Sequence, residues 1–143
     1  MSQEPVELDE VLKGLPHAEP FRFLDRVVKL EENRAEGVWS VRGDEDFFRG
    51  HFPGRPLVPG VLMSEAAAQL AGLITHQRTG VNAAVLVLSE ARFKQSVKPP
   101  ADIDLQVNGE RVMGAIHLFD FSVKVDGALC ADGQVGLRVD DSA

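Results

Sequence analysis

Three groups within fifteen residues could carry out acid–base chemistry next to a carbonyl: His51, Gly60 and Glu65. An imidazole takes up a proton near neutral pH, and a carboxyl group that loses water favours its neutral form and can give one. A glycine at a helix start leaves a backbone N–H open to an approaching oxygen. A base, an acid and such a donor suit the removal of a proton beside a carbonyl.

The surrounding sequence predicts how these groups are positioned. Residues 50–59 contain three prolines and two glycines, which excludes a helix or sheet interior and predicts a rigid loop presenting His51. From Pro59 to Ile74 the chain is apolar around most of the helical circumference, which predicts a buried helix. If Pro59 lies in the first turn, Glu65 is too deep in that helix to cap it.

Both side chains also have a purely structural interpretation. Glu65 could pair with an arginine or cap a loop, because burying a carboxylate without a partner is costly. His51 could donate to a carbonyl in its tight loop. The pattern of residues alone leaves these alternatives open.

Rival chemistries have weaker support in the sequence. The four histidines show no metal-ligand spacing, and we find no phosphate-loop, dinucleotide-binding or nucleophile-elbow motif. We therefore expect neither a metal nor an organic cofactor.

Composition favours a soluble cytoplasmic domain that spans residues 1–143, with loose tails at 1–5 and 140–143. The net charge of -7 without a basic stripe argues against nucleic-acid binding. The acidic start predicts no secretory signal, and the longest apolar stretch is too short and interrupted to span a membrane. A single cysteine, Cys130, excludes an intrachain disulfide.

Hydrophobic periodicity predicts a short helix over 6–15, strands over 21–30 and 36–42, the long helix, and then four strands. Val85, Val87, Ala91 and Phe93 are expected on one face of the first of these four. Turns are predicted at 126–127 and at 113–114, the latter in preference to 108–109. This order is typical of an α+β hotdog fold, in which a curved antiparallel sheet wraps a central helix.

The stretch FFRGHFPGRPLVPGVLMSEAAAQ (residues 47–69) resembles, without a gap, the signature of the 3-hydroxyacyl-[acyl-carrier-protein] dehydratases of the FabZ type. Weaker matches occur at 15–17, 20–21, 25–27, 91–93 and 125–127. The resemblance implies loss of water from a (3R)-3-hydroxyacyl thioester on acyl carrier protein, giving the trans-2-enoyl thioester without a cofactor. The pathway would be fatty-acid, related lipid or polyketide biosynthesis.

The resemblance also implies a role for each candidate residue. His51 would take the α-proton, Glu65 would help expel the 3-hydroxyl as water, and the Gly60 N–H would hold the thioester carbonyl. In this family the histidine and the acid of one site come from different subunits, which implies a homodimer, and members commonly form hexamers as trimers of dimers. Glutamate rather than the aspartate of the FabA type implies a dehydratase without efficient isomerisation.

An acyl tunnel is a further implication of the family. Its expected lining residues are Phe52, Pro59, Val61, Gln69 and Phe93. Relatives carry Arg-Tyr where this chain has Ala18 and Glu19, and the tyrosine gates their tunnel. Because this chain has no tyrosine, Glu19 is the possible gate. Relatives also show Pro-Gly-Asp where this chain has Pro-Ala-Asp at 100–102. Acyl length and pathway stay open.

Carrier protein is acidic, so docking would need a local basic patch. The candidates are Arg92, Lys94 and Lys98, with Arg49 and Arg55 flanking His51; ordinary solvated surface is the alternative. Two rival functions also stay open, namely a hotdog acyl thioesterase and a non-catalytic acyl-binding subunit. Product analysis separates the thioesterase, and the presence together of His51, Gly60 and Glu65 argues against the binding subunit.

Overall fold

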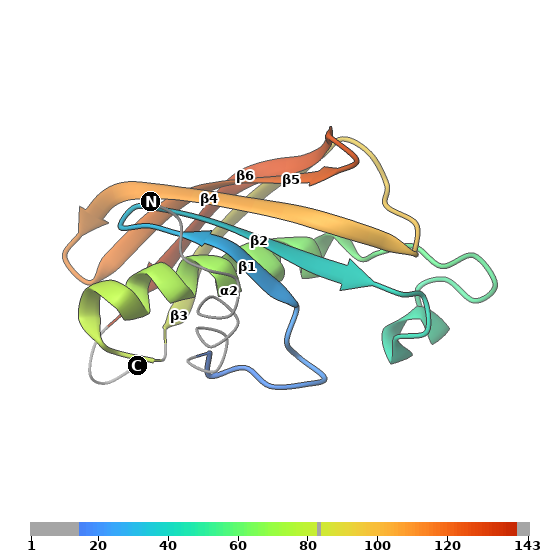
Figure 1. Cartoon of the computed structure of the whole chain (residues 1–143), viewed down its shortest axis with the longest axis horizontal. Helices are drawn as coiled ribbons and strands as arrows, with labels where there is room; N and C mark the ends of the chain where they lie inside the picture. Colours follow the sequence, from blue (N-terminus) through green and yellow to red (C-terminus); the bar gives the residue numbers. More distant parts are fainter. Residues whose placement is uncertain (1–14, 83, 140–143) are drawn as a thin grey trace.

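The computed structural model describes residues 15–82 and 84–139, and consists of one long helix against a six-stranded antiparallel sheet (Figure 1). The elements are β1 (Arg26–Leu30), β2 (Arg34–Val41), η2 (Asp46–Arg49), α2 (Gly60–Thr79), β3 (Val85–Phe93), β4 (Ala101–Met113), β5 (Ile116–Val125) and β6 (Ala128–Arg138). The strand order is β1-β2-β4-β5-β6-β3. The predicted hotdog fold is confirmed; the helix predicted over 6–15 lies almost wholly outside the described residues.

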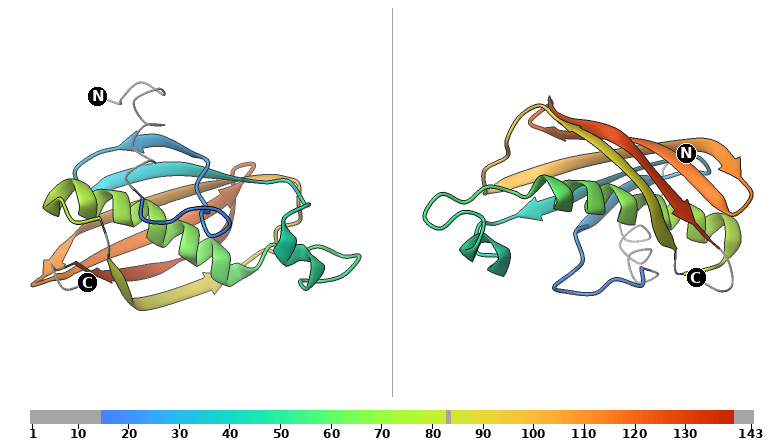
Figure 2. Two further views of the ribbon diagram at one scale, coloured as in Figure 1. Left: turned by 90° about the horizontal axis from the view of Figure 1, so that it is seen from below. Right: turned by 180° about the vertical axis from the view of Figure 1, so that it is seen from behind.

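The central helix α2 crosses the concave face of the sheet, with β1 and β3 at opposite edges (Figure 2). Its apolar side chains are buried on most sides, as the sequence predicts, and Ala67, Leu70 and Ile74 have no exposed surface. The helix begins after Pro59, whose carbonyl accepts from the N–H groups of Leu62 and Met63. It ends at Gly80. None of the described helices is long and apolar enough to cross a membrane.

Alternating apolar residues of β4, β5 and β6 form the face of the sheet that packs on α2. Ile103, Val107, Phe119 and Val123 are fully buried there. The first hairpin turns through Gly114-Ala115, one residue after the predicted 113–114, and the second turns through Asp126-Gly127 as predicted. Gly114, Asp126 and Gly127 have positive φ. The competing Asn108-Gly109 pair instead lies within β4, at a register shift. The preference for the later turn is therefore confirmed.

Two details of the predicted strands are wrong. The strand expected over 21–30 is regular only from Arg26, because the Phe23 N–H and the Phe21 carbonyl are bonded to the side chain of Gln69 instead of to a neighbouring strand. In β3, a register shift between Leu86 and Leu88 interrupts the alternation, so Val85 pairs with Arg138 and does not share the face of Ala91.

The edge strand β3 exposes an apolar surface that a folded monomer would normally cover. Val85, Leu86, Val87 and Phe93 are each 39–50% exposed, although all four are large and apolar. An exposed apolar edge strand offers unpaired backbone groups to another chain. This edge is therefore a candidate surface for pairing between subunits.

Candidate active site

His51 lies in the loop between η2 and α2, which projects beyond the sheet at the N-terminal end of the helix (Figure 1). Its Nδ1 lies 2.8 Å from the carbonyl oxygen of Leu57, and the Leu57 N–H donates back to the His51 carbonyl at 3.1 Å. Because a carbonyl can only accept, Nδ1 carries a proton, and in the neutral ring Nε2 is then the nitrogen with the lone pair. The loop hydrogen bond considered as an alternative is thus present, and it selects the tautomer that a general base needs.

Gly60 occupies the first position of α2, where backbone N–H groups have no partner within the helix. No acceptor for the N–H of Gly60 or Val61 is found among residues 15–82 and 84–139. The Phe93 ring packs directly over Gly60, and an added Cβ would lie 2.9 Å from that ring. Glycine therefore allows β3 and the helix start to approach closely while leaving a donor open.

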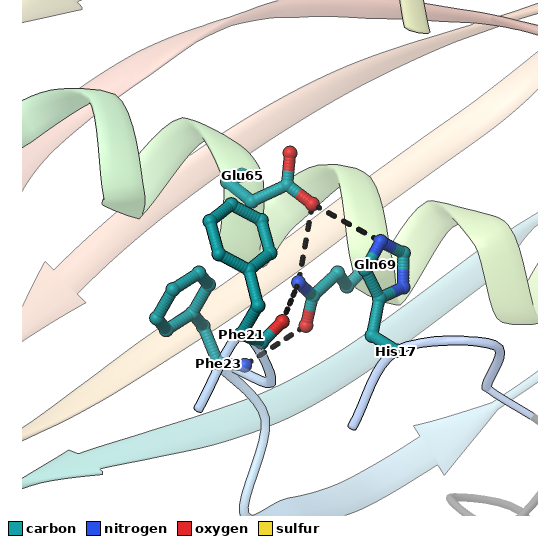
Figure 3. Close-up of polar contacts among 5 residues, drawn as sticks. All are labelled: His17, Phe21, Phe23, Glu65 and Gln69. Atoms are coloured by element: carbon teal, nitrogen blue, oxygen red, sulfur yellow. Dashed lines mark hydrogen bonds and ion pairs between the residues drawn. The ribbon is translucent and has the colours of Figure 1, made fainter. Parts of the chain in front are cut away.

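Glu65 lies in the second turn of α2 with 21% of its side chain exposed, and Gln69 lies one turn further along (Figure 3). The amide of Gln69 accepts from the Phe23 N–H (2.9 Å) and donates to the Phe21 carbonyl (3.0 Å), which fixes its orientation. The same Nε2 also donates to Glu65 Oε2 at 3.1 Å. Glu65 therefore has an oriented carboxyl group, and its partner is an amide instead of the arginine considered as an alternative.

The chain does not bring His51 and Glu65 together. Glu65 and Gln69 line a cavity of about 240 Å³ between α2, the segment before β1, and the strands β3 and β6. His51 does not line that cavity, and in the described part of the chain no hydrogen bond or ion pair joins the two side chains. A single copy therefore holds His51 and the Glu65 cavity in two separate places.

The predicted tunnel residues are divided between the surroundings of His51 and the cavity of Glu65. Gln69 is buried beside Glu65, whereas Phe52 stacks on His51 with ring centroids 4.4 Å apart. Pro59 is buried at the helix start, and Val61 and Phe93 are exposed around it. Gln69 lines the cavity of Glu65 and Phe52 lines a different one, so the tunnel stays a prediction.

Glu19, the possible gate, lies on an exposed turn away from Glu65. It lines a different cavity, of about 580 Å³, whose walls include the aromatic rings of Phe21, Phe23, Trp39 and Phe47. Phe21 is the one wall residue that this cavity shares with the cavity of Glu65. The gating role of Glu19 is not tested by this placement.

The candidate docking cations differ in their surroundings. Arg92 pairs with Asp132 (Nε–Oδ1 3.2 Å), and Arg49 pairs with Asp46 at the same distance. Lys94 follows the end of β3, so it does not share a face of that strand with Arg92. Lys98 and Arg55 line a cavity with Phe52, next to His51, and neither has an ion-pair partner among the described residues.

His17 is a site residue that the sequence analysis missed. Its Nε2 lies 3.5 Å from Glu65 Oε2, and its ring stacks near Phe21 with centroids 6.3 Å apart. The weak family match at 15–17 was the available signal. The sequence separation from Glu65 gave no reason to place the two side chains together.

Comparisons with known proteins agree with the resemblance of the sequence. Residues 15–134 match a protein family described as a FabA-like domain. The chain is 36% identical to 3-hydroxyacyl-[acyl-carrier-protein] dehydratase FabZ of Sinorhizobium fredii, over 93% of this chain and 89% of that protein. It is also 36% identical to the FabZ of Paracidovorax citrulli, over 91% of this chain and 94% of that protein.

Solved structures with low sequence identity share the fold. The dehydratase heterocomplex ApeI:P of Xenorhabdus doucetiae matches with a TM-score of 0.78 and 17% identity, over 98% of this chain and 94% of that one. A hypothetical thioesterase protein of Streptococcus pneumoniae, solved with coenzyme A, matches with a TM-score of 0.64 and 12% identity, over 80% and 84%. At these identities the likeness concerns the fold alone.

Proposed function

The chain belongs to the FabA-like family and, within it, to the FabZ-type 3-hydroxyacyl-[acyl-carrier-protein] dehydratases; from this premise we propose how its residues divide the reaction. The enzyme removes water from a 3-hydroxyacyl thioester on acyl carrier protein in fatty-acid biosynthesis. We propose that the substrate is the (3R) epimer and the product the trans-2-enoyl thioester.

His51 acts as the base that removes the proton from the carbon next to the thioester carbonyl. The observation that carries this proposal is the hydrogen bond from His51 Nδ1 to the Leu57 carbonyl, because in the neutral ring it makes Nε2 the nitrogen that can accept a proton. As the C–H bond breaks, negative charge develops on the carbonyl oxygen. The open N–H of Gly60, at the positive end of α2, is suited to hold that charge.

Glu65 acts as the acid. It gives its proton to the 3-hydroxyl group, the C–O bond breaks, and water leaves while the C=C bond forms. His51 then carries the proton taken from the substrate and Glu65 is a carboxylate, so a proton returned from His51 to Glu65 through solvent resets the site. The oriented carboxyl group beside a cavity supports this role.

A homodimer is the smallest unit that we propose to be active. Two observations support it: the separation of His51 from the Glu65 cavity, and the exposed apolar edge of β3. In a two-fold dimer each site would combine His51 and Gly60 of one copy with Glu65 of the other. The larger assembly, a trimer of dimers, rests on the family resemblance alone.

We propose that carrier protein docks first on Lys98 and Arg55. Both line the cavity next to His51 and lack ion-pair partners in the described structure, whereas the charge of Arg92 is already opposed by Asp132. Charge reversal at Lys98 should weaken turnover of carrier-bound substrate and spare small thioesters. Equal losses on both substrates would contradict this assignment.

Product analysis tests the reaction itself. Purified protein is incubated with a trans-2-enoyl thioester, and loss of the conjugated ultraviolet absorbance reports hydration, the reverse of dehydration. Hydration without release of free thiol is the expected result. Release of free thiol would indicate a thioesterase instead. If neither a small thioester nor the carrier-bound substrate were turned over, the protein would be a non-catalytic binding subunit.

Mixing two inactive variants tests the shared site. His51→Ala and Glu65→Ala are unfolded together and refolded as a mixture, so that about half of the dimers are mixed. Each mixed dimer would then have one intact site, and the mixture should regain about a quarter of wild-type activity. No recovery from a mixture shown to contain mixed dimers would place both residues in one subunit's site.

A further inference from the structure

We propose that His17 is a positioning residue, which with Gln69 holds Glu65 Oε2 as an acceptor so that the transferred proton resides on Oε1. This inference rests on the proposed role of Glu65 as the acid. Figure 3 shows the arrangement: the contacts from Gln69 and His17 meet on one carboxyl oxygen, and the other oxygen points away from both.

The first step of the argument is the orientation of Gln69. Phe23 N–H can only donate and the Phe21 carbonyl can only accept, so the Gln69 amide cannot be turned over without losing both bonds. Its Nε2 therefore faces Glu65 as a donor, at 3.1 Å from Oε2. An oxygen that faces a donor accepts, so a proton on the carboxyl group belongs on Oε1.

The second step is the protonation of His17. Its Nδ1 is buried and has no hydrogen-bond partner, whereas its Nε2 lies 3.5 Å from Glu65 Oε2. A buried N–H without an acceptor is rarer and more costly than an unsatisfied acceptor. In the neutral ring this places the proton on Nε2, the nitrogen that lies near the oxygen contacted by Gln69. The separation is long for a hydrogen bond, as in many sites without bound substrate.

The third step is that the buried Gln69 amide determines the position of both groups that face Glu65, its own Nε2 and that of His17. The backbone bonds from Gln69 to Phe21 and Phe23 fix the segment that carries His17, and the Phe21 N–H also donates to the Ala18 carbonyl at 2.8 Å. Stacking of the His17 ring beside Phe21 sets the direction of the imidazole. The segment before β1 thus contributes to the chemistry of a residue on α2.

Two substitutions at one position test the inference. His17→Leu removes the donor at similar bulk. It should lower kcat about 10- to 100-fold, the range for one lost hydrogen bond to the carboxylate that Glu65 becomes as it gives up its proton, with KM changed less than about twofold. His17→Gln places an amide Nε2 near the lost imidazole Nε2 and should recover most of kcat. His76→Leu, near the other end of α2, is the matched control and should keep wild-type kcat.

A double-mutant cycle with Glu65→Gln separates positioning from a general structural effect. If His17 acts through Glu65, His17→Leu should cost almost nothing further in the Glu65→Gln background. Losses that multiply, or a His17→Gln variant as slow as His17→Leu with an unchanged melting temperature, would overturn the inference alone. Wild-type turnover by Glu65→Gln would overturn the proposed acid and this inference with it.

Discussion

The two ends of α2 hold polar clusters of opposite character. At the C-terminal end Arg78 donates to Asn33 Oδ1 (2.8 Å), His117 Nδ1 (3.0 Å) and the Gly109 carbonyl, and its guanidinium carbon lies 5.4 Å from the centre of the Phe119 ring. Each of these polar groups has a partner. Satisfied buried networks stabilise a fold and leave nothing for a ligand.

At the N-terminal end several groups have no partner within the described structure. The Gly60 N–H, His51 Nε2 and His17 Nδ1 are all open. The comparison also shows that a shifted pKa does not by itself mark the reactive end. Burial, followed by the charge of Arg78, lowers the pKa of His117, yet this histidine belongs to the satisfied cluster. Polar groups without a hydrogen-bond partner therefore identify the candidate site better than a shifted pKa does.

The largest effect expected from this comparison is a loss of activity without a loss of stability. His51→Ala should lower kcat/KM for enoyl thioester hydration by about 10²- to 10⁴-fold, because a positioned base is removed. The melting temperature should change little, since the half-buried ring has one hydrogen bond. A large fall in melting temperature would show that this end is structural too.

Two glycines, one near each end of α2, face a phenylalanine ring, and replacing them by alanine compares how much each end contributes to stability. A Cβ on Gly109 would overlap the ring of Phe119, which is fully buried, so Gly109→Ala should lower the free energy of unfolding by about 3 kcal/mol. Gly60→Ala meets the half-exposed ring of Phe93, which can turn away, so its effect should stay below about 1 kcal/mol. Urea unfolding measures both. Equal losses would remove the contrast.

Removal of the Arg78 guanidinium should lower the stability of the fold and leave the catalytic rate unchanged. Arg78→Met leaves the Asn33 oxygen and the Gly109 carbonyl without their donor, and should lower the free energy of unfolding by about 2 kcal/mol. Arg92→Met, at an exposed ion pair, is the control and should change it by less than about 0.5 kcal/mol. If Arg78→Met also had a lower kcat per folded molecule, the two ends of α2 would not be independent and the prediction would be wrong.

The smallest expected effect is a pH dependence of stability from His117. Its pKa is lowered in the fold, so the unfolded chain binds the proton more readily. Stability from this group is therefore present above the unfolded value of about 6.5 and is lost as pH falls towards the folded value, with a slope of at most about 1.4 kcal/mol per pH unit. Thermal unfolding between pH 5 and 8 should show a flatter profile for His117→Gln than for wild type. Identical profiles would exclude the effect.

The sequence predicted those features that depend on local periodicity and turn chemistry. The long helix and the turns near Gly114 and at 126–127 are of this kind. What it missed depends on long-range contacts. Gln69 binds the backbone around Phe21 and so shortens a predicted strand, and it also holds the segment that places His17 beside Glu65. Asp132, on a different strand, likewise pairs with Arg92.

The Gln69 amide forms its hydrogen bonds to the segment before β1 with backbone atoms, at Phe21 and Phe23. That segment is where Ala18 and Glu19 stand in place of the arginine and tyrosine of relatives. The side chains at positions 18 and 19 can change over evolution, or be changed by an engineer, while the backbone hydrogen bonds that orient Gln69 stay in place. The hydrogen bond from Gln69 to Glu65 therefore depends on the backbone of this segment and not on its exposed residues at 18 and 19, so that surface can vary without rebuilding the surroundings of the carboxyl group.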